Sequence, residues 1–146
     1  MTNPATTTRT AACGCGQLRI EVDGEPLGVG VCHCFACQQR TGSVFATLAS
    51  FATPYRVTGN ATEYRRTGDH GASFVFRFCP VCGSNLFDTE DGVRDRVSVA
   101  VGGFRDSMFP APTVSVHDRR RHGWVRLPKA MIRFDGDREL LPAVRG

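Results

Sequence analysis

Seven cysteines are the residues of this sequence with the clearest potential for chemistry. They fall into three groups, here called the first pair (Cys13 and Cys15), the trio (Cys32, Cys34 and Cys37) and the last pair (Cys79 and Cys82). Only one or two residues separate neighbouring thiols within a group, a spacing that lets their sulfurs share one metal ion. The number is odd and the N-terminal residues contain no apolar segment of a secretory signal, so a cytoplasmic protein without disulfides is expected. We therefore predict that these thiols bind metal, with zinc as the ion.

Two ways of combining the groups compete. In the first, the last two cysteines of the trio join the last pair as a zinc ribbon and leave three thiols over. In the second, the first and last pairs form one site and the trio stands alone. A glycine directly follows the second cysteine of each pair, at Gly16 and Gly83, whereas Gln38 follows the trio. Because glycine adopts positive φ readily and lets backbone N–H groups approach the sulfurs, this pattern favours the second combination.

The second combination separates the chemistry of the two sites. Four cysteine ligands are typical of a closed, structural zinc, whereas three protein ligands leave one position open, as in catalytic sites. Three thiolates outweigh the 2+ charge of zinc, so the trio would form a weak Lewis acid that is better suited to holding a soft thiolate than to activating water. The alternative is a second closed site, completed by His33 or by a distant residue. In an extended segment His33 would point away from the face that Cys32 and Cys34 share.

Strand patterns dominate the elements that must position these thiols. The clearest alternation of apolar and polar residues covers residues 17–23, 73–78, 97–101 and 113–117, and weaker candidates cover 55–58, 63–66 and 131–134. No segment has a sustained helical period, and the 16 glycines and 8 prolines suit short strands joined by turns. We predict an all-β single domain over residues 11–146 after a disordered tail over residues 1–10, with the cysteines on loops between antiparallel strands.

The composition excludes several classes of protein. A chain of 146 residues is long enough to bury a core without disulfides. Its 18 Lys and Arg residues against 14 Asp and Glu form no long basic stripe, so nucleic acid is not an expected partner. No apolar run approaches the length needed to span a membrane, and no membrane association is expected.

Three blocks of the sequence resemble one known family. The blocks are CGCGQLRIEV, VGVCHCFACQQRTGSVFA and RFCPVCGSNLF, which lie between residues 13 and 87. They are similar to the glutathione-dependent formaldehyde-activating enzymes, a family that also includes centromere protein V. A looser resemblance continues to about residue 137.

The resemblance implies a mostly antiparallel β-tent-like fold with two zinc ions per chain. It implies a structural zinc held by Cys13, Cys15, Cys79 and Cys82, and a catalytic zinc held by Cys32, Cys34 and Cys37. The implied activity is that of a carbon–sulfur lyase, which joins glutathione and formaldehyde to S-hydroxymethylglutathione or reverses that reaction. A small-molecule thiol and an aldehyde are thus the expected partners, and a homodimer formed through the sheet is a further possibility.

Polar residues after the trio are candidates for the substrate site. We predict that Gln38, Thr41 and Ser43 line the pocket, with a role in forming a turn as the alternative. The basic run Arg119–Arg121 either meets a substrate carboxylate or forms a solvated loop. His117 and Trp124 match a late block of the family and either face the zinc cleft or pack against the protein.

Two other functions compete with the lyase. The resemblance to centromere protein V raises a non-enzymatic zinc module that binds protein or nucleic acid, although this chain lacks a long basic extension. A redox sensor, in which an exposed trio oxidises and releases its metal, is the third hypothesis.

Overall fold

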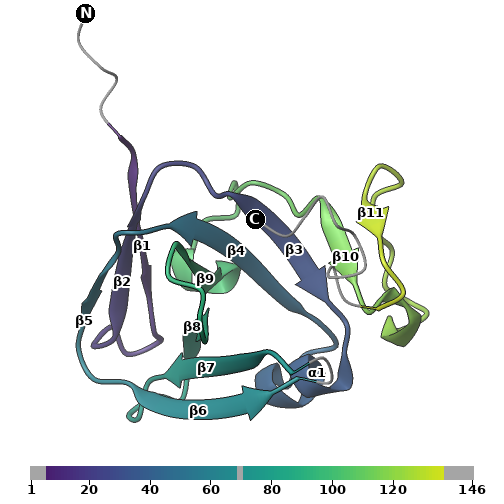
Figure 1. The fold of residues 1–146 in the computed structure, drawn as a ribbon. Coiled ribbons are helices and arrows are strands. Elements are labelled where there is room, and N and C mark those ends of the chain that lie inside the picture. Colours follow the sequence, from purple (N-terminus) through teal and green to yellow (C-terminus); the bar gives the residue numbers. More distant parts are fainter. Residues whose placement is uncertain (1–5, 69–70, 137–146) are drawn as a thin grey trace, which may run out of the picture. The chain divides into compact units, whose positions relative to one another are not determined.

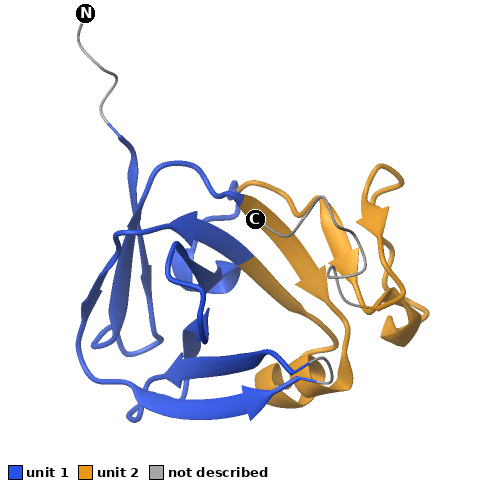
Figure 2. Cartoon of the chain, viewed as in Figure 1, with its two compact units in different colours: residues 1–27, 49–109 blue, residues 28–48, 110–146 orange. Residues whose placement is uncertain are grey.

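The structure, a computed structural model, describes residues 6–68 and 71–136. Strands dominate this part of the chain, and the elements between them are one α-helix and two short 3-10 helices (Figure 1). The chain divides into two compact units, of which unit 1 comprises residues 1–27 and 49–109, and unit 2 comprises residues 28–48 and 110–146 (Figure 2). Each unit is therefore built from segments that are distant in the sequence.

Unit 1 contains most of the strands. They are β1 (Thr8–Ala12), β2 (Arg19–Asp23), β5 (Arg56–Thr58), β6 (Thr62–Thr67), β7 (Ser73–Phe78), β8 (Asn85–Glu90) and β9 (Arg96–Ala100), followed by the 3-10 helix η1 (Val101–Phe104). Strands β1, β2 and β5 form an antiparallel three-stranded sheet in that order. Strands β9, β8, β7 and β6 form an antiparallel meander, and the second half of β4 (Ala46–Ala52) lies beside β9. The turns β1–β2 and β7–β8 carry the first and last cysteine pairs.

The core of unit 1 follows from alternation along these strands. Ile20 and Val22 on β2 are fully buried, while Glu21 between them is partly exposed. Phe51 is also fully buried, and its ring centroid lies 5.7 Å from that of Phe104 in η1. A Cβ atom added at Gly103 in η1 would lie 2.7 Å from Cδ1 of the buried Leu86, so a larger residue at this position would require Leu86 to shift.

Unit 2 contains β3 (Gly28–Cys32), the first half of β4, the helix α1 (Phe35–Thr41), β10 (Val114–Val116), the 3-10 helix η2 (Asp118–Arg120) and β11 (Ile132–Arg133). Its strands follow the order β11-β10-β3-β4. Strand β10 is parallel to both β3 and β11, and its residue Val116 lies opposite Cys32. The pairing with β10 therefore fixes the end of β3 where the trio begins.

The predicted fold class is confirmed, and every predicted strand has a counterpart. The four clear patterns correspond to β2, β7, β9 and β10, and the three weaker ones to β5, β6 and β11. Strand β1 begins at Thr8, inside the range predicted as a disordered tail, because residues 8–10 pair with β2. Residues 1–5 lie outside the described residues.

The structure departs from the sequence-based expectations in three local details. The sequence predicted no helix, yet α1 is present; with seven residues it is too short to show a helical period. The cysteines were expected on loops, but Cys32 ends β3 and Cys37 lies within α1. The strands were expected to be mostly antiparallel, and they are; the exception is β10, which pairs in parallel with β3 and β11, as the long connections between them in the sequence allow.

Candidate metal centres

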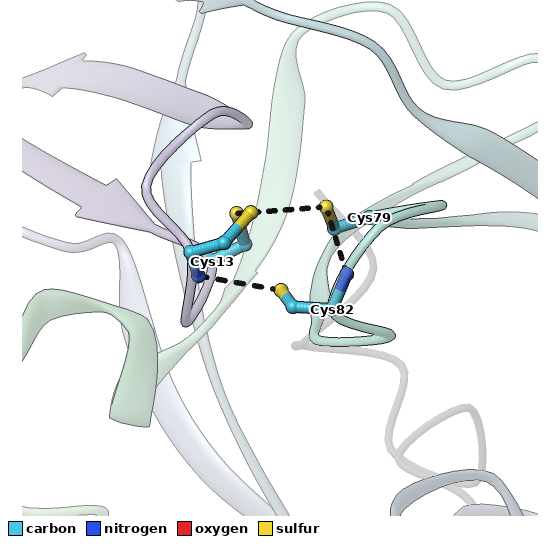
Figure 3. A group of neighbouring side chains, drawn as sticks. Cys13, Cys79 and Cys82 are labelled. Atoms are coloured by element: carbon cyan, nitrogen blue, oxygen red, sulfur yellow. Dashed lines mark hydrogen bonds between the residues drawn. The ribbon is translucent and has the colours of Figure 1, made fainter.

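The first and last cysteine pairs come together in unit 1. The four sulfurs all lie within 4.8 Å of one another, with 3.6 Å between those of Cys13 and Cys15 and 3.7 Å between those of Cys15 and Cys79. A tetrahedral zinc with Zn–S bonds of about 2.3 Å requires sulfurs about 3.8 Å apart. Figure 3 shows Cys13, Cys79 and Cys82 pointing toward one another from the two turns. The four sulfurs therefore fit a closed tetrahedral metal ion, as the second combination predicted.

Each pair sits on a tight turn that ends in a left-handed glycine. Gly16 and Gly83 have φ values of 84° and 78°, which side chains with a Cβ adopt rarely. The backbone N–H of Gly16 donates to the carbonyl of Cys13 (3.0 Å), and that of Gly83 donates to the carbonyl of Cys79 (2.9 Å). The positive φ inferred from the two glycines is confirmed, and it turns the chain back so that both sulfurs of a pair face the same point.

Hydrogen bonds from the two turns are directed at the sulfurs. Backbone N–H groups of Leu18, Cys15 and Val81 donate to the sulfurs of Cys13, Cys82 and Cys79 over 3.3, 3.4 and 3.4 Å, respectively. A shorter bond of 2.9 Å runs from Nε2 of Gln17 to Sγ of Cys79. Donors in these positions stabilise thiolates, the form in which cysteine binds metal.

The pKa values of this group diverge because its thiols are crowded. Hydrogen bonds from Ser84, followed by that from the Cys15 N–H, lower the pKa of Cys82 to about 5. The N–H of Gln17 favours the ionised form of Cys15, but burial and the neighbouring thiols outweigh it and raise the pKa of Cys15 to about 11. Without a cation the sulfurs therefore resist ionising together, which a bound metal ion would relieve.

The trio comes together in unit 2, at the junction of β3 and α1. Its three sulfurs also lie within 4.8 Å of one another. Cys34 is the N-cap of α1, and its sulfur accepts a hydrogen bond of 3.3 Å from the N–H of Cys37. Among the described residues, the group has these three members and no fourth His, Cys, Asp or Glu.

The thiols of the trio also oppose one another's ionisation. Hydrogen bonds from Cys34 and then Cys37, together with burial, raise the pKa of the Cys32 thiol far above its ordinary value. Because three thiols at this distance cannot all ionise without a compensating cation, a bound metal ion would let them ionise together. A guanidinium lies close by, since Nη2 of Arg40 is 3.7 Å from Sγ of Cys37.

His33 is buried beside the trio but is not a member of it. The side chain is fully buried, and its ring centroid lies 5.7 Å from that of Phe45. Burial is the main cause that lowers its pKa, so the neutral imidazole is favoured. The part of the chain that the structure describes offers neither ring nitrogen a hydrogen-bond partner. This placement agrees with the expectation that His33 points away from the face of Cys32 and Cys34.

The polar residues after the trio make contacts within unit 2. Nε2 of Gln38 donates to the carbonyls of His33 (2.8 Å) and Arg120 (3.4 Å), and its Oε1 lies 3.0 Å from Nε2 of His122. Thr41 Oγ1 donates to the carbonyl of Cys37 (2.8 Å) and accepts from the N–H of Ser43 (3.1 Å). These bonds hold α1 and its C-terminal turn in place, so the role of the three residues toward a substrate stays a prediction.

The basic run divides into side chains with different roles. The Arg120 guanidinium lies 4.4 Å from the ring centroid of Phe35, the first residue of α1. Arg121 donates to the carbonyl of Val125 (2.7 Å), and Arg119 is exposed. His117 precedes η2 with a φ of 51°, and Trp124 is 70% exposed. Sequence reasoning missed His122, which a tertiary contact with Gln38 places at α1, and Arg40, which the helix itself brings close to Cys37.

Comparison with known proteins identifies the class of this chain. The sequence matches the family model of the glutathione-dependent formaldehyde-activating enzymes over residues 8–120. Within this range lie the two cysteine clusters that could hold metal ions. The chain belongs to that family, as the sequence blocks predicted. The match covers β1 through η2 and includes all seven cysteines.

A solved structure supports the fold. A Rhodobacter sphaeroides protein, determined as a structural genomics target, is similar over 86% of this chain and 98% of that chain, with 23% identity and a TM-score of 0.50. No curated protein matches the chain. Among the described residues, no helix has the length and apolar character that crossing a membrane requires.

Proposed function

We propose that this chain is a zinc-dependent carbon–sulfur lyase that forms or cleaves the adduct of a thiol, glutathione or a close relative, and an aldehyde such as formaldehyde. The observation that carries this proposal is the trio, where three cysteine sulfurs converge at the start of a helix without a fourth ligand among the described residues. The family to which the chain belongs is associated with glutathione-dependent formaldehyde activation. The proposal includes a cytoplasmic location, since clustered thiols that bind metal are typical of a reducing compartment.

The two cysteine groups take different roles in this proposal. Cys13, Cys15, Cys79 and Cys82 would hold a structural zinc, because four sulfurs at tetrahedral spacing complete its coordination. Cys32, Cys34 and Cys37 would hold the catalytic zinc and leave one position for the substrate thiol. When bound at the trio, zinc supplies a soft cation that favours the ionised form of that thiol.

The reaction then needs orientation more than acid–base catalysis. The thiol loses its proton to solvent, and its sulfur attacks the carbonyl carbon of the aldehyde. A carbon–sulfur bond forms, the π electrons move to the oxygen, and the oxygen takes a proton from water. Cleavage follows the same steps in reverse. The residues of α1 and its junction with β3 contribute by fixing the three sulfurs, through the cap at Cys34 and the bonds of Gln38 to the backbone.

Metal analysis combined with exchange spectroscopy tests this proposal. The purified protein should contain two zinc ions, and Cys32→Ser should retain one. Exchange NMR of ¹³C-formaldehyde with glutathione should show faster adduct interconversion with the wild-type protein than without it, and no acceleration with Cys32→Ser. Arg126→Gln, a change at an exposed residue of unit 2, serves as the control and should match the wild type. Two zinc ions without any acceleration would refute the lyase and favour a binding module.

A further inference from the structure

Arg40 places a permanent positive charge beside the trio. It lies three residues after Cys37 on α1, so both side chains project from the same face of the helix. The distance from its Nη2 to Sγ of Cys37 is 3.7 Å, within hydrogen-bonding range for a sulfur acceptor. Cys37 itself is buried, so this contact is made where solvent screens charge poorly. An arginine guanidinium stays protonated in proteins, so this charge is permanent.

If the proposed function holds, the negative charge of the metal-loaded trio is the reason why a nearby guanidinium would affect substrate binding. Three thiolates around a divalent ion give a net charge of about −1, and a thiolate substrate as fourth ligand would bring it to about −2. Each added negative charge opposes the next. A guanidinium that donates to one of the sulfurs offsets one unit of this charge and draws electron density from the sulfur. The site with its substrate would then carry about the same charge as the three-thiolate site alone.

We propose that Arg40 is a positioning residue whose charge, acting through the sulfur of Cys37, enables the trio to accept an anionic thiolate as its fourth ligand. This inference rests on the proposed function and adds to it the requirement that the substrate sulfur binds as an anion. A purely structural role of Arg40 predicts a different effect of its substitution. Arg40 is the basic residue in the last turn of α1, where a cation stabilises a helix, and that role would change stability without changing thiol affinity.

Thiol binding to the cobalt-substituted protein tests the proposal without relying on turnover. Thiolate coordination to cobalt(II) produces charge-transfer absorption, and the closed four-cysteine group contributes a constant background. Titrations with glutathione and with 2-mercaptoethanol, which carries no carboxylate, are compared for wild type, Arg40→Gln, Arg40→Lys and the control Arg126→Gln. Cobalt content is measured for each protein.

We expect Arg40→Gln to weaken the binding of both thiols about tenfold, since it removes a charge close to a poorly solvated site. Arg40→Lys should stay within about threefold of wild type, because it keeps the charge but loses the planar fork. Arg126→Gln should bind as wild type. If Arg40→Gln loses the trio metal, Arg40→Lys is compared with wild type instead. Metal and thiol binding by Arg40→Lys at wild-type levels would then support the proposal.

Three results would overturn the inference. Equal thiol affinity in Arg40→Gln and wild type would show that the charge is not needed. A loss for glutathione alone would show that Arg40 contacts a carboxylate rather than compensating the sulfur. Loss of the trio metal in both Arg40→Gln and Arg40→Lys would assign Arg40 to packing. These outcomes differ from a failure of the proposed function, in which the wild-type trio itself binds no thiol.

Discussion

Gln17 ties together three parts of unit 1 at the four-cysteine group. Its Nε2 donates to Sγ of Cys79 (2.9 Å) and to the carbonyl of Asn60 (2.8 Å), and its Oε1 accepts from the N–H of Asn60 (2.9 Å). The side chain therefore connects the turn after the first cysteine pair to the β5–β6 turn and to the last pair. We predict that Gln17→Ala lowers both the stability of the protein and its hold on the metal.

The size of the effect follows from these three bonds. A hydrogen bond to a charged group contributes about 1.5–3 kcal/mol and a neutral one about 1 kcal/mol. Gln17 is only partly buried, so water replaces some of the lost bonds and the sum falls to about 2–3 kcal/mol. Loss of a partner that hydrogen-bonds a metal ligand lowers metal affinity by about 10–100-fold.

Urea unfolding and competition with a chromogenic chelator measure the two quantities. Gln39→Ala is a matched control, because Gln39 is an exposed glutamine on α1. It should change the free energy of unfolding by no more than about 0.5 kcal/mol. Gln17→Glu should weaken metal binding more than Gln17→Ala, since a carboxylate would face a thiolate. If Gln17→Ala released metal and unfolded as the wild type does, the bond to Cys79 would have no energetic role.

Three further predictions concern packing, metal removal and the helix surface. Gly103→Ala should destabilise the protein by about 1–3 kcal/mol in urea, because its Cβ would overlap the buried Leu86, and an unchanged midpoint would contradict this. A strong chelator should lower the melting temperature much more than Cys32→Ser does, if the four-cysteine group holds the structural metal as proposed; equal shifts in calorimetry would contradict the division of roles. A double-mutant cycle between Arg120 and Phe35 should give a coupling of about 0.5–1 kcal/mol, and zero coupling would show that the contact is not formed in solution.

Sequence reasoning found the strands whose two faces differ. β2 and β9 bury every second residue, and such alternation is visible without a structure. It missed β3 and β4, which read GVGVC and ATLASFA, because glycine, alanine and serine give a weak contrast between the faces. It also missed β8, where the three consecutive residues 86–88 are buried and no alternation remains.

The two cysteine groups were predictable because their determinants are local. The positive φ at Gly16 and Gly83 is a property of short turns, and it separated the two pairs from the trio. The residues that support the groups depend on tertiary contacts or on a helix too short to predict. Gln17 reaches Cys79 across 62 positions of sequence, and Arg40 approaches Cys37 only because α1 forms. The sequence therefore predicts the candidate metal ligands better than it predicts the residues that support them.

The two groups differ in how much chain they connect. Cys15 and Cys79 are 64 residues apart, so a metal ion at the four-cysteine group closes a long loop, whereas the trio joins neighbours along one short segment. By the entropy of loop closure, a cross-link of this span removes about 4 kcal/mol of freedom from the unfolded chain. A metal ion at the four-cysteine group would thus act as a reversible cross-link between distant parts of the chain. A secreted protein would use a disulfide for the same purpose. The trio constrains almost no chain, so related sequences are free to alter or lose it without losing the fold.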